Sequence, residues 1–168
     1  MQRRTLLKLG LTSAAVLAVA GGAAALLEPG LEGGALSSAG REVFAAIGLA
    51  VLDKSLPAED GARQIALNGL LSRVDALVQA LPPHAQSELS QLLALLASAA
   101  GRRTLAGLSQ SWPEASVADL QQALQDMRLS TLALRQQAYA ALHDITAGAY
   151  FSDEARWPLL GYPGPLKI

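Results

Sequence analysis

The two histidines are the side chains of this 168-residue sequence best suited to proton transfer near neutral pH. His84 follows a Pro-Pro pair at the expected start of a helix, where we expect it to be solvated. His143 precedes Asp144 near the end of the last expected helix, where the macrodipole favours a cation. Adjacent helical residues point in different directions, so this pair is not expected to form part of a catalytic triad.

The other common catalytic and binding patterns are missing from the sequence. No serine stands in a G-x-S-x-G turn, no G-x-G-x-x-G follows an expected strand, and no cluster has metal-ligand spacing. The sequence has no cysteine, which excludes disulfides, thiolate metal sites, iron–sulfur ligation and covalent haem attachment by this chain. We therefore expect no catalytic residue, cofactor site or metal site here, and a role as an escort or structural subunit.

The composition predicts one helical domain. Hydrophobic residues make up 51% of the chain and aromatic residues 4%, and leucine and alanine dominate. These two residues have the highest helix propensities, whereas β-branched residues are few. The 13 basic and 14 acidic side chains nearly balance, and no Lys/Arg cluster forms a patch, so nucleic acid is not an expected partner.

Apolar residues recur at spacings of three and four along residues 41–149, which predicts an all-α domain. We expect an irregular bundle of about five or six helices. Prolines after the first two helices, Gly101 as a C-terminal cap and a Ser116–Asp119 capping box set their limits. The first expected helix carries its apolar face over residues 43–51 and is stopped by Pro57, and the second covers residues 67–81. The third begins at Pro83 and ends at Gly101. A short helix over 102–108 and helices over 117–127 and about 131–148 follow.

The first 27 residues have the parts of an export signal. Arg3 and Arg4, followed by Leu6, Leu7 and Lys8, resemble the twin-arginine pattern R-R-x-F-L-K, with leucine in place of phenylalanine. Residues 9–27 are uncharged, rich in Ala and Gly and only mildly hydrophobic. We therefore expect a twin-arginine signal peptide, transient contact with the inner membrane, and a periplasmic protein.

An uncleaved membrane anchor is the alternative for this segment, because 19 helical residues would span about 28 Å. Its glycines, its many alanines and the polar Thr12–Ser13 pair count against an anchor. Signal peptidase could cut after the small residues Ala23 and Ala25, or after Ser37 and Ala39. Residues 28–40 are expected to be a flexible linker that contains the cleavage region.

The last 19 residues have a different composition. Residues 150–168 contain three prolines and about half of the aromatic residues of the chain, which predicts an extended tail. Aromatic side chains offer a large contact area, so such a tail usually packs on something. It could pack on its own bundle or insert against a partner subunit, where Trp and Tyr are common anchors.

Two strings in this tail resemble a family signature. Trp157 to Gly164, WPLLGYPG, is similar to the W-x-x-x-G-Y-P-G motif near the C-terminus of gluconate 2-dehydrogenase subunit 3, and Tyr150 to Asp153, YFSD, resembles the aromatic-aromatic-x-Asp piece that precedes it. Residues 44–57 are similar to the first helix of that family. The resemblance covers the signal, this helix and the last 20 residues.

The resemblance implies a small accessory subunit that is exported with a folded flavin-dependent dehydrogenase of the glucose–methanol–choline class. FAD, and any iron–sulfur or haem relay, would then belong to the partner subunits. The residues expected to bind the partner are Tyr150, Phe151, Trp157, Gly161, Tyr162 and Pro163.

Three rival roles stay open on the sequence. The chain could be a stand-alone periplasmic binding protein or chaperone, or a subunit anchored in the inner membrane by its first helix. The third rival is an enzyme that uses His143 and Asp144.

Overall fold

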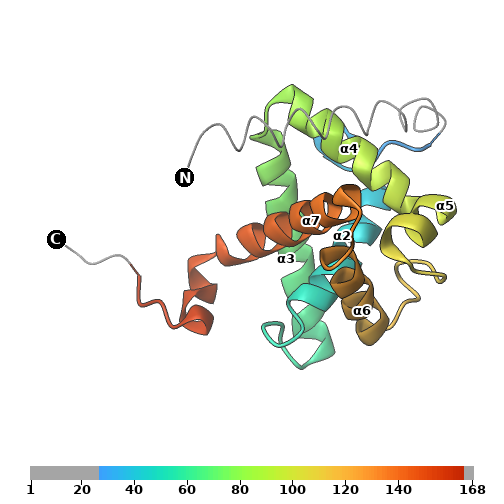
Figure 1. Cartoon of the computed structure of the whole chain (residues 1–168). Coiled ribbons are helices and arrows are strands. Elements are labelled where there is room, and N and C mark those ends of the chain that lie inside the picture. The colour runs from blue at the N-terminus through green and yellow to red at the C-terminus, as the bar shows by residue number, and fades with distance from the viewer. Residues whose placement is uncertain (1–26, 165–168) are drawn as a thin grey trace.

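The helix at the centre of the fold is α2 (Ser38–Val51). In the computed structural model, which describes residues 27–164, α2 packs against four other helices: α3 (Asp60–Gln79), α4 (Pro83–Ala97), α6 (Val117–Arg128) and α7 (Ala133–Phe151) (Figure 1). Its side chains Val43, Phe44 and Ile47 are completely buried. The apolar face read from the sequence is therefore the face on which the bundle is assembled.

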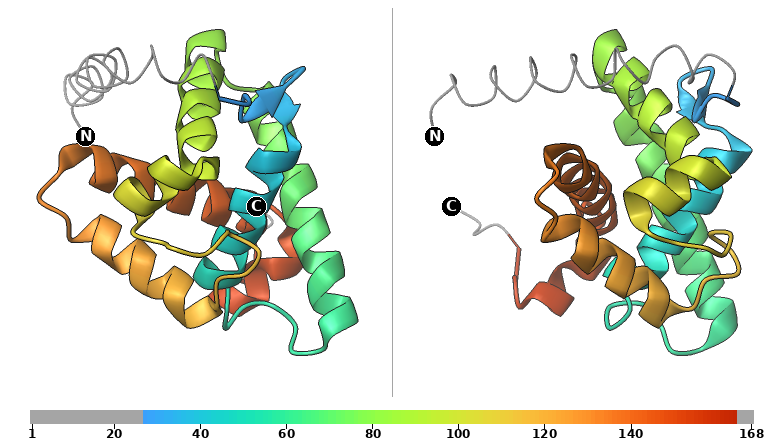
Figure 2. Two further views of the ribbon diagram at one scale, coloured as in Figure 1. Left: turned by 90° about the vertical axis from the view of Figure 1, so that its right-hand side faces the viewer. Right: turned by 45° about the vertical axis from the view of Figure 1, so that its right-hand side comes forward.

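Short elements complete the described part of the chain. They are the hairpin strands β1 (Leu31–Glu32) and β2 (Ala35–Leu36), the short helix α5 (Ala99–Gly101), the π-helix η1 (Arg102–Ala106) and the 3₁₀-helix η2 (Glu154–Leu160). Figure 2 shows the hairpin beside α3 and α4, and η2 beyond the end of α7. Within residues 27–164, five helices of 12 to 20 residues form the bundle, which confirms the all-α prediction.

Most helix limits agree with the sequence signals. Pro83 is the first residue of α4. The Ser116 hydroxyl accepts a hydrogen bond from the backbone N–H of Asp119 at 3.2 Å and donates one to its carboxylate at 2.7 Å. The shorter aspartate therefore binds the serine hydroxyl, where the glutamate of a capping box would reach the serine backbone.

The prediction that Gly101 caps the helix that begins at Pro83 is wrong. Helix α4 ends at Ala97 with Ser98 as its C-cap, and the next glycine with left-handed backbone geometry, Gly107 at φ 78°, ends η1. Gly101 is buried instead, and a Cβ atom there would collide with the Leu95 carbonyl oxygen. Glycine is therefore required at position 101 because the backbone there passes close to the Leu95 carbonyl oxygen, and not because a helix ends there.

Residues 28–40 are folded onto the bundle, so the prediction of a flexible linker is wrong. Gly33 and Gly34 both have positive φ, as a two-residue hairpin turn requires, and Leu31 pairs with Leu36. The Leu36 N–H donates to the Asp75 carboxylate of α3 at 2.8 Å. These contacts give backbone N–H groups of residues 28–40 hydrogen-bond partners within the same domain.

The same segment provides the start of α2. The Ser37 hydroxyl accepts a hydrogen bond from the Gly40 N–H at 3.1 Å and so caps the helix, and Ala39 lies within the first turn. A cut after Ala39 would remove the cap and the hairpin. Of the two suggested cleavage sites, Ser37–Ala39 therefore lies inside the fold, and Ala23–Ala25 lies outside the described residues.

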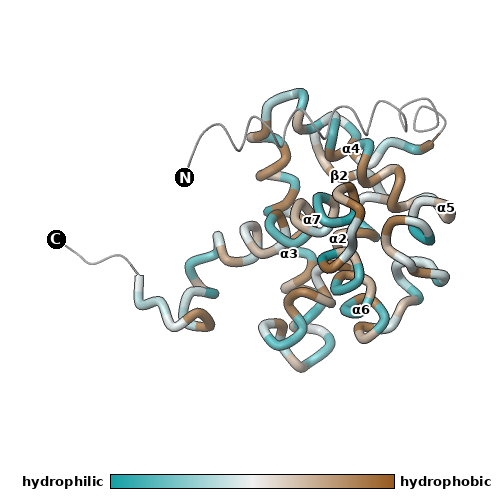
Figure 3. The backbone as a smooth tube through the Cα atoms, in the orientation of Figure 1, coloured by the Kyte–Doolittle hydropathy of each residue, from teal (hydrophilic) through white to brown (hydrophobic). Residues whose placement is uncertain are grey.

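Hydropathy follows the packing of the helices. Figure 3 shows apolar stretches where helices meet in the middle of the bundle and polar stretches on the outer turns. Among residues 27–164, no helix combines the length and the apolar character needed to cross a membrane.

The N-cap of α3 predicts one pH effect on stability. The Glu59 carboxylate accepts hydrogen bonds from the N–H groups of Ala62 and Gly61, at 2.6 and 2.9 Å, and these bonds lower its pKa. A carboxyl whose folded-state pKa is lowered stabilises the fold above its ordinary pKa, and this contribution is lost as the pH falls through the folded-state pKa. Glu59→Ala should therefore lower the free energy of unfolding at pH 7 and change it less at pH 3.

Urea unfolding of the two proteins at both pH values measures this difference. Glu42→Ala is a suitable control, because Glu42 is exposed and lies in α2, away from the cap of α3. An equal effect of Glu59→Ala at pH 7 and pH 3 would contradict the assignment of the charged carboxylate as the cap.

Candidate partner-binding site

Tyr150 and Phe151 belong to the last turn of α7 and not to an extended tail. Tyr150 is completely buried, and its hydroxyl donates a hydrogen bond to the Ser55 carbonyl oxygen at 2.8 Å. Its ring meets that of Phe151 edge to face, with centroids 5.2 Å apart. The prediction of Tyr150 as a partner contact is wrong, because a large apolar ring at this position completes the core of the chain itself.

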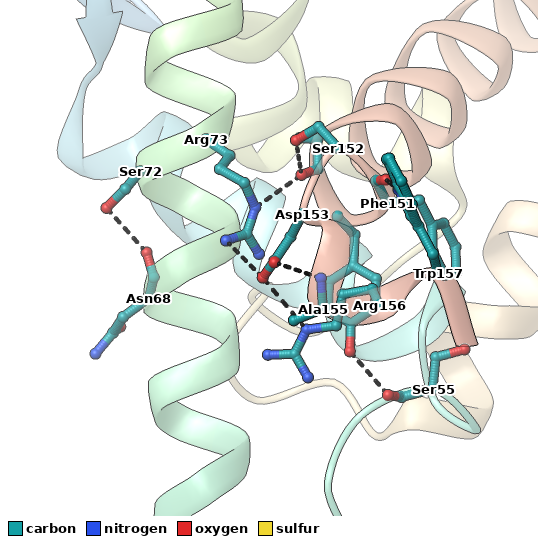
Figure 4. Close-up of polar contacts among 12 residues, drawn as sticks. Ser55, Asn68, Ser72, Arg73, Phe151, Ser152, Asp153, Ala155, Arg156 and Trp157 are labelled. Carbon is teal, nitrogen blue, oxygen red and sulfur yellow. Dashed lines mark hydrogen bonds and ion pairs between the residues drawn. The ribbon is translucent and has the colours of Figure 1, made fainter. Parts of the chain in front are cut away.

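A group of charged residues fixes the chain after α7. Arg73 of α3 donates from Nε to the Ala149 carbonyl oxygen at 2.8 Å, and its Nη1 lies 3.5 Å from Asp153 Oδ2 (Figure 4). Asp153 also accepts from the Ala155 N–H at 3.0 Å and pairs with Arg156 at 3.5 Å. Asp153 therefore caps η2 and joins it to α3 at the same time.

Trp157 and Gly161 hold the turn that follows. The Trp157 indole N–H donates to the Phe151 carbonyl oxygen at 3.0 Å, and its ring lies 5.3 Å from that of Tyr162. Gly161 ends η2 with φ 69°, a left-handed geometry that glycine adopts without strain. The segment expected to be extended is a folded turn over residues 154–164.

This turn exposes apolar side chains to solvent. Leu159 and Leu160 are each 57% exposed and Tyr162 is 44% exposed. Beside them is a hollow of about 260 Å³ that includes Trp157, Gly161, Tyr162 and Pro163, four of the six residues predicted to bind a partner. We call this region the C-terminal turn surface; it consists of Trp157, Pro158, Leu159, Leu160, Gly161, Tyr162 and Pro163.

The C-terminal turn surface has the properties of a docking site. Its backbone is fixed by Asp153 and Trp157, so little conformational entropy remains to be lost when a partner binds. Its exposed leucines and tyrosine provide apolar contact area at one end of the molecule, beyond α7 (Figure 1). The six predicted residues therefore separate into two that pack on the bundle, Tyr150 and Phe151, and four that line this surface.

Leu159, Leu160 and Arg73 belong to this candidate site but were not predicted from the sequence. Leu159 and Leu160 stand between two prolines, and an adjacent apolar pair in such a segment was the available signal. Arg73 gave no signal, because its contact with Asp153 joins residues 80 positions apart in the chain and depends on the fold.

The histidines lie elsewhere. His84 is exposed in the first turn of α4, as expected. His143 Nδ1 and Asp144 Oδ1 lie 3.0 Å apart, so the expectation that these side chains diverge is wrong. The side chains are 40% and 79% exposed, and the imidazole stacks on Tyr139 with centroids 5.4 Å apart. Within residues 27–164, no three His, Asp or Glu side chains gather as a metal site would require.

The predicted export signal, Arg3, Arg4, Leu6, Leu7 and Lys8, lies outside the described residues. Comparisons of the chain with protein-family models, with curated protein sequences and with solved structures returned no match.

Proposed function

We propose that this chain is a non-catalytic accessory subunit that binds a folded flavin-dependent dehydrogenase and escorts it through the twin-arginine translocase to the periplasm. The observation that carries the proposal is the C-terminal turn surface, where Leu159, Leu160 and Tyr162 are exposed on a backbone fixed to the bundle. Rigid, exposed aromatic and aliphatic groups are the usual anchors of a protein interface.

Two features of the sequence support the remaining parts of the proposal. The arginine pair followed by an uncharged apolar stretch supports export in the folded state. The tail motif similar to that of gluconate 2-dehydrogenase subunit 3 supports a flavoprotein as the partner. In this division of labour FAD is bound by the partner, and this chain supplies the signal and the docking surface.

Removing the arginine pair should move the dehydrogenase partner from the periplasm to the cytoplasm. Changing Arg3 and Arg4 to Lys keeps the charge but removes the pair that the translocase reads. Dehydrogenase activity should then stay in the cytoplasmic fraction, whereas the unchanged chain directs it to the periplasm. Activity assays on the two fractions, in cells that make both proteins, measure the distribution.

Arg102→Lys and Arg103→Lys provide the matched control, because these arginines are adjacent to each other but lie in η1. This variant should export the dehydrogenase normally. Periplasmic activity with the Arg3→Lys, Arg4→Lys variant would overturn the escort role.

A stand-alone periplasmic helical protein is the second candidate, because the turn is also held to its own bundle by the Arg73–Asp153 ion pair and the Trp157 hydrogen bond to Phe151. Co-purification separates the two. An escort should elute with a yellow flavoprotein, and a stand-alone protein should elute by itself. Mass spectrometry of the mature N-terminus identifies an anchored subunit, since an uncleaved chain would retain Arg3 and Arg4.

A further inference from the structure

A second apolar feature lies at a distance from the C-terminal turn surface, between α4 and α7. These two helices both pack on α2 and leave an open groove of about 690 Å³ between them. Its apolar walls include Ala85, Leu89 and Leu92 from α4, and Leu134, Ala141 and Ile145 from α7. Such a groove is suited to an amphipathic or apolar helix.

We propose that this groove holds the uncharged N-terminal segment, residues 9–26, of the same chain until a translocase binds it. The segment is apolar and therefore needs cover in water between synthesis and membrane contact. The proposal concerns the precursor alone and does not depend on which partner the chain carries.

The path of the chain brings the segment to α4. The Gly30 N–H donates to the Ser90 carbonyl oxygen at 3.2 Å, and the Leu31 N–H donates to the Ser90 hydroxyl at 3.1 Å. Both contacts lie on α4, the helix that forms one wall of the groove. The chain that follows the segment is therefore fixed to α4, on the helix face opposite the groove.

The segment must cross α4 to enter the groove. At about 100° per residue, Ser90 lies on the side of α4 opposite Glu88 and Leu92, which line the groove. The chain must pass around the helix, which is about 10–12 Å in diameter, so the path over half the circumference is about 16–19 Å. About five extended residues, such as 25–29, cover that distance. The groove follows α7 from Ala133 to Ile145, about 18 Å, so about 12 helical residues fill it and the remaining residues of the segment are enough.

The side-chain size and the charge of the N-terminal segment also match those of the groove. Alanine and glycine dominate residues 9–26, and small side chains let two helices approach closely, as do Ala85, Ala138 and Ala141 in the groove. The charged residues that line the groove are Glu88 and Asp144, both acidic. The charges that precede the apolar segment are Arg3, Arg4 and Lys8, all basic. The groove thus favours a segment with a basic end.

The chain has no cysteine, so the proposal can be tested in the full-length precursor with pairs of introduced cysteines. Ala18→Cys in the segment is combined with Ala140→Cys, an exposed groove residue, and treated with a short bismaleimide. The matched control combines Ala18→Cys with Ala118→Cys, an exposed alanine of α6. The tether from Ala18 to Leu27 is about nine residues and has an average reach of about 16 Å. The Ala85→Trp comparison therefore separates docking in the groove from mere proximity to Ala140.

Docking in the groove should make the Ala140 pair react at least about ten-fold faster than the Ala118 pair, because binding raises the local concentration at one place. Ala85→Trp, which fills the groove from α4, should reduce the Ala140 rate to that of the control. Circular dichroism confirms that each variant is folded.

Equal rates for the two pairs would overturn the proposal, as would an Ala140 rate that Ala85→Trp leaves unchanged. A cross-link that forms only between chains, seen by mixing light and heavy-isotope chains, would assign the groove to a second copy and also overturn it. All these variants keep Arg3 and Arg4, and the cross-linking is done on the purified precursor without the partner protein. A negative result here therefore leaves the export test of the proposed function unaffected.

Discussion

Replacing Tyr150 with alanine should lower the free energy of unfolding by about 3–5 kcal/mol, the usual cost of removing a fully buried aromatic side chain. The ring is completely buried and contacts Phe151, and Arg156 lies over its face at 5.2 Å. Tyr150→Phe keeps the ring and loses only the hydrogen bond to Ser55, so it should cost about 1 kcal/mol. Urea unfolding of the purified variants measures both values.

Tyr162→Ala is the matched control and should have the opposite profile. Tyr162 is exposed, so its removal should change the free energy of unfolding by no more than about 0.5 kcal/mol. As an anchor on the C-terminal turn surface, it should instead contribute about 2 kcal/mol to partner binding, about a 30-fold change in Kd. Stable Tyr150→Ala protein, or unchanged partner affinity in Tyr162→Ala, would contradict this division between core and surface.

Replacing Gly30 with alanine should lower the free energy of unfolding by about 2–3 kcal/mol. A Cβ atom at Gly30 would collide with Leu93 Cβ and lie 2.7 Å from the Ser90 carbonyl oxygen, so the hairpin would have to move away from α4. The hydrogen bonds that Gly30 and Leu31 donate to Ser90 would then be lost. Thermal and urea unfolding measure the loss.

Gly148→Ala is the control with the same chemical change. Gly148 lies in α7, and an added Cβ there meets nothing within 4 Å. Alanine favours the helix over glycine, so this variant should be more stable by about 0.5–1 kcal/mol. If Gly30→Ala were as harmless as Gly148→Ala, residues 28–40 would be a linker after all.

The helices could be predicted from the sequence because their signals are local. Pro83 and Ser116 act within one turn of the helix that they start, and the apolar spacing of α2 describes a single face. The hairpin also had a local signal, Gly33–Gly34 between two apolar residues, but strands of two residues are too short to show alternation. The same glycines are also typical of a flexible linker, so the sequence by itself favours the wrong alternative for residues 28–40.

The candidate site was predictable only in part. The aromatic and proline residues of the tail indicate the region where the structure exposes apolar side chains, since composition alone identifies unusual contact area. Composition does not show which aromatic ring faces inward. The Tyr150 ring faces inward because its hydroxyl binds the Ser55 carbonyl oxygen and because Arg73 binds the Ala149 carbonyl oxygen at the C-terminal end of α7. Ser55 and Arg73 both lie far from the tail in sequence.

The central position of α2 has a consequence for the order of events during synthesis. Helix α2 leaves the ribosome early, but α6 and α7, which cover two of its sides, are made about 70 to 100 residues later. Non-local contacts of this kind form slowly, because the intervening chain must be closed into a loop first. The leading arginines are thus outside the ribosome well before the bundle can close. The core around α2 is therefore complete only when α7, the last helix of the bundle, has been made.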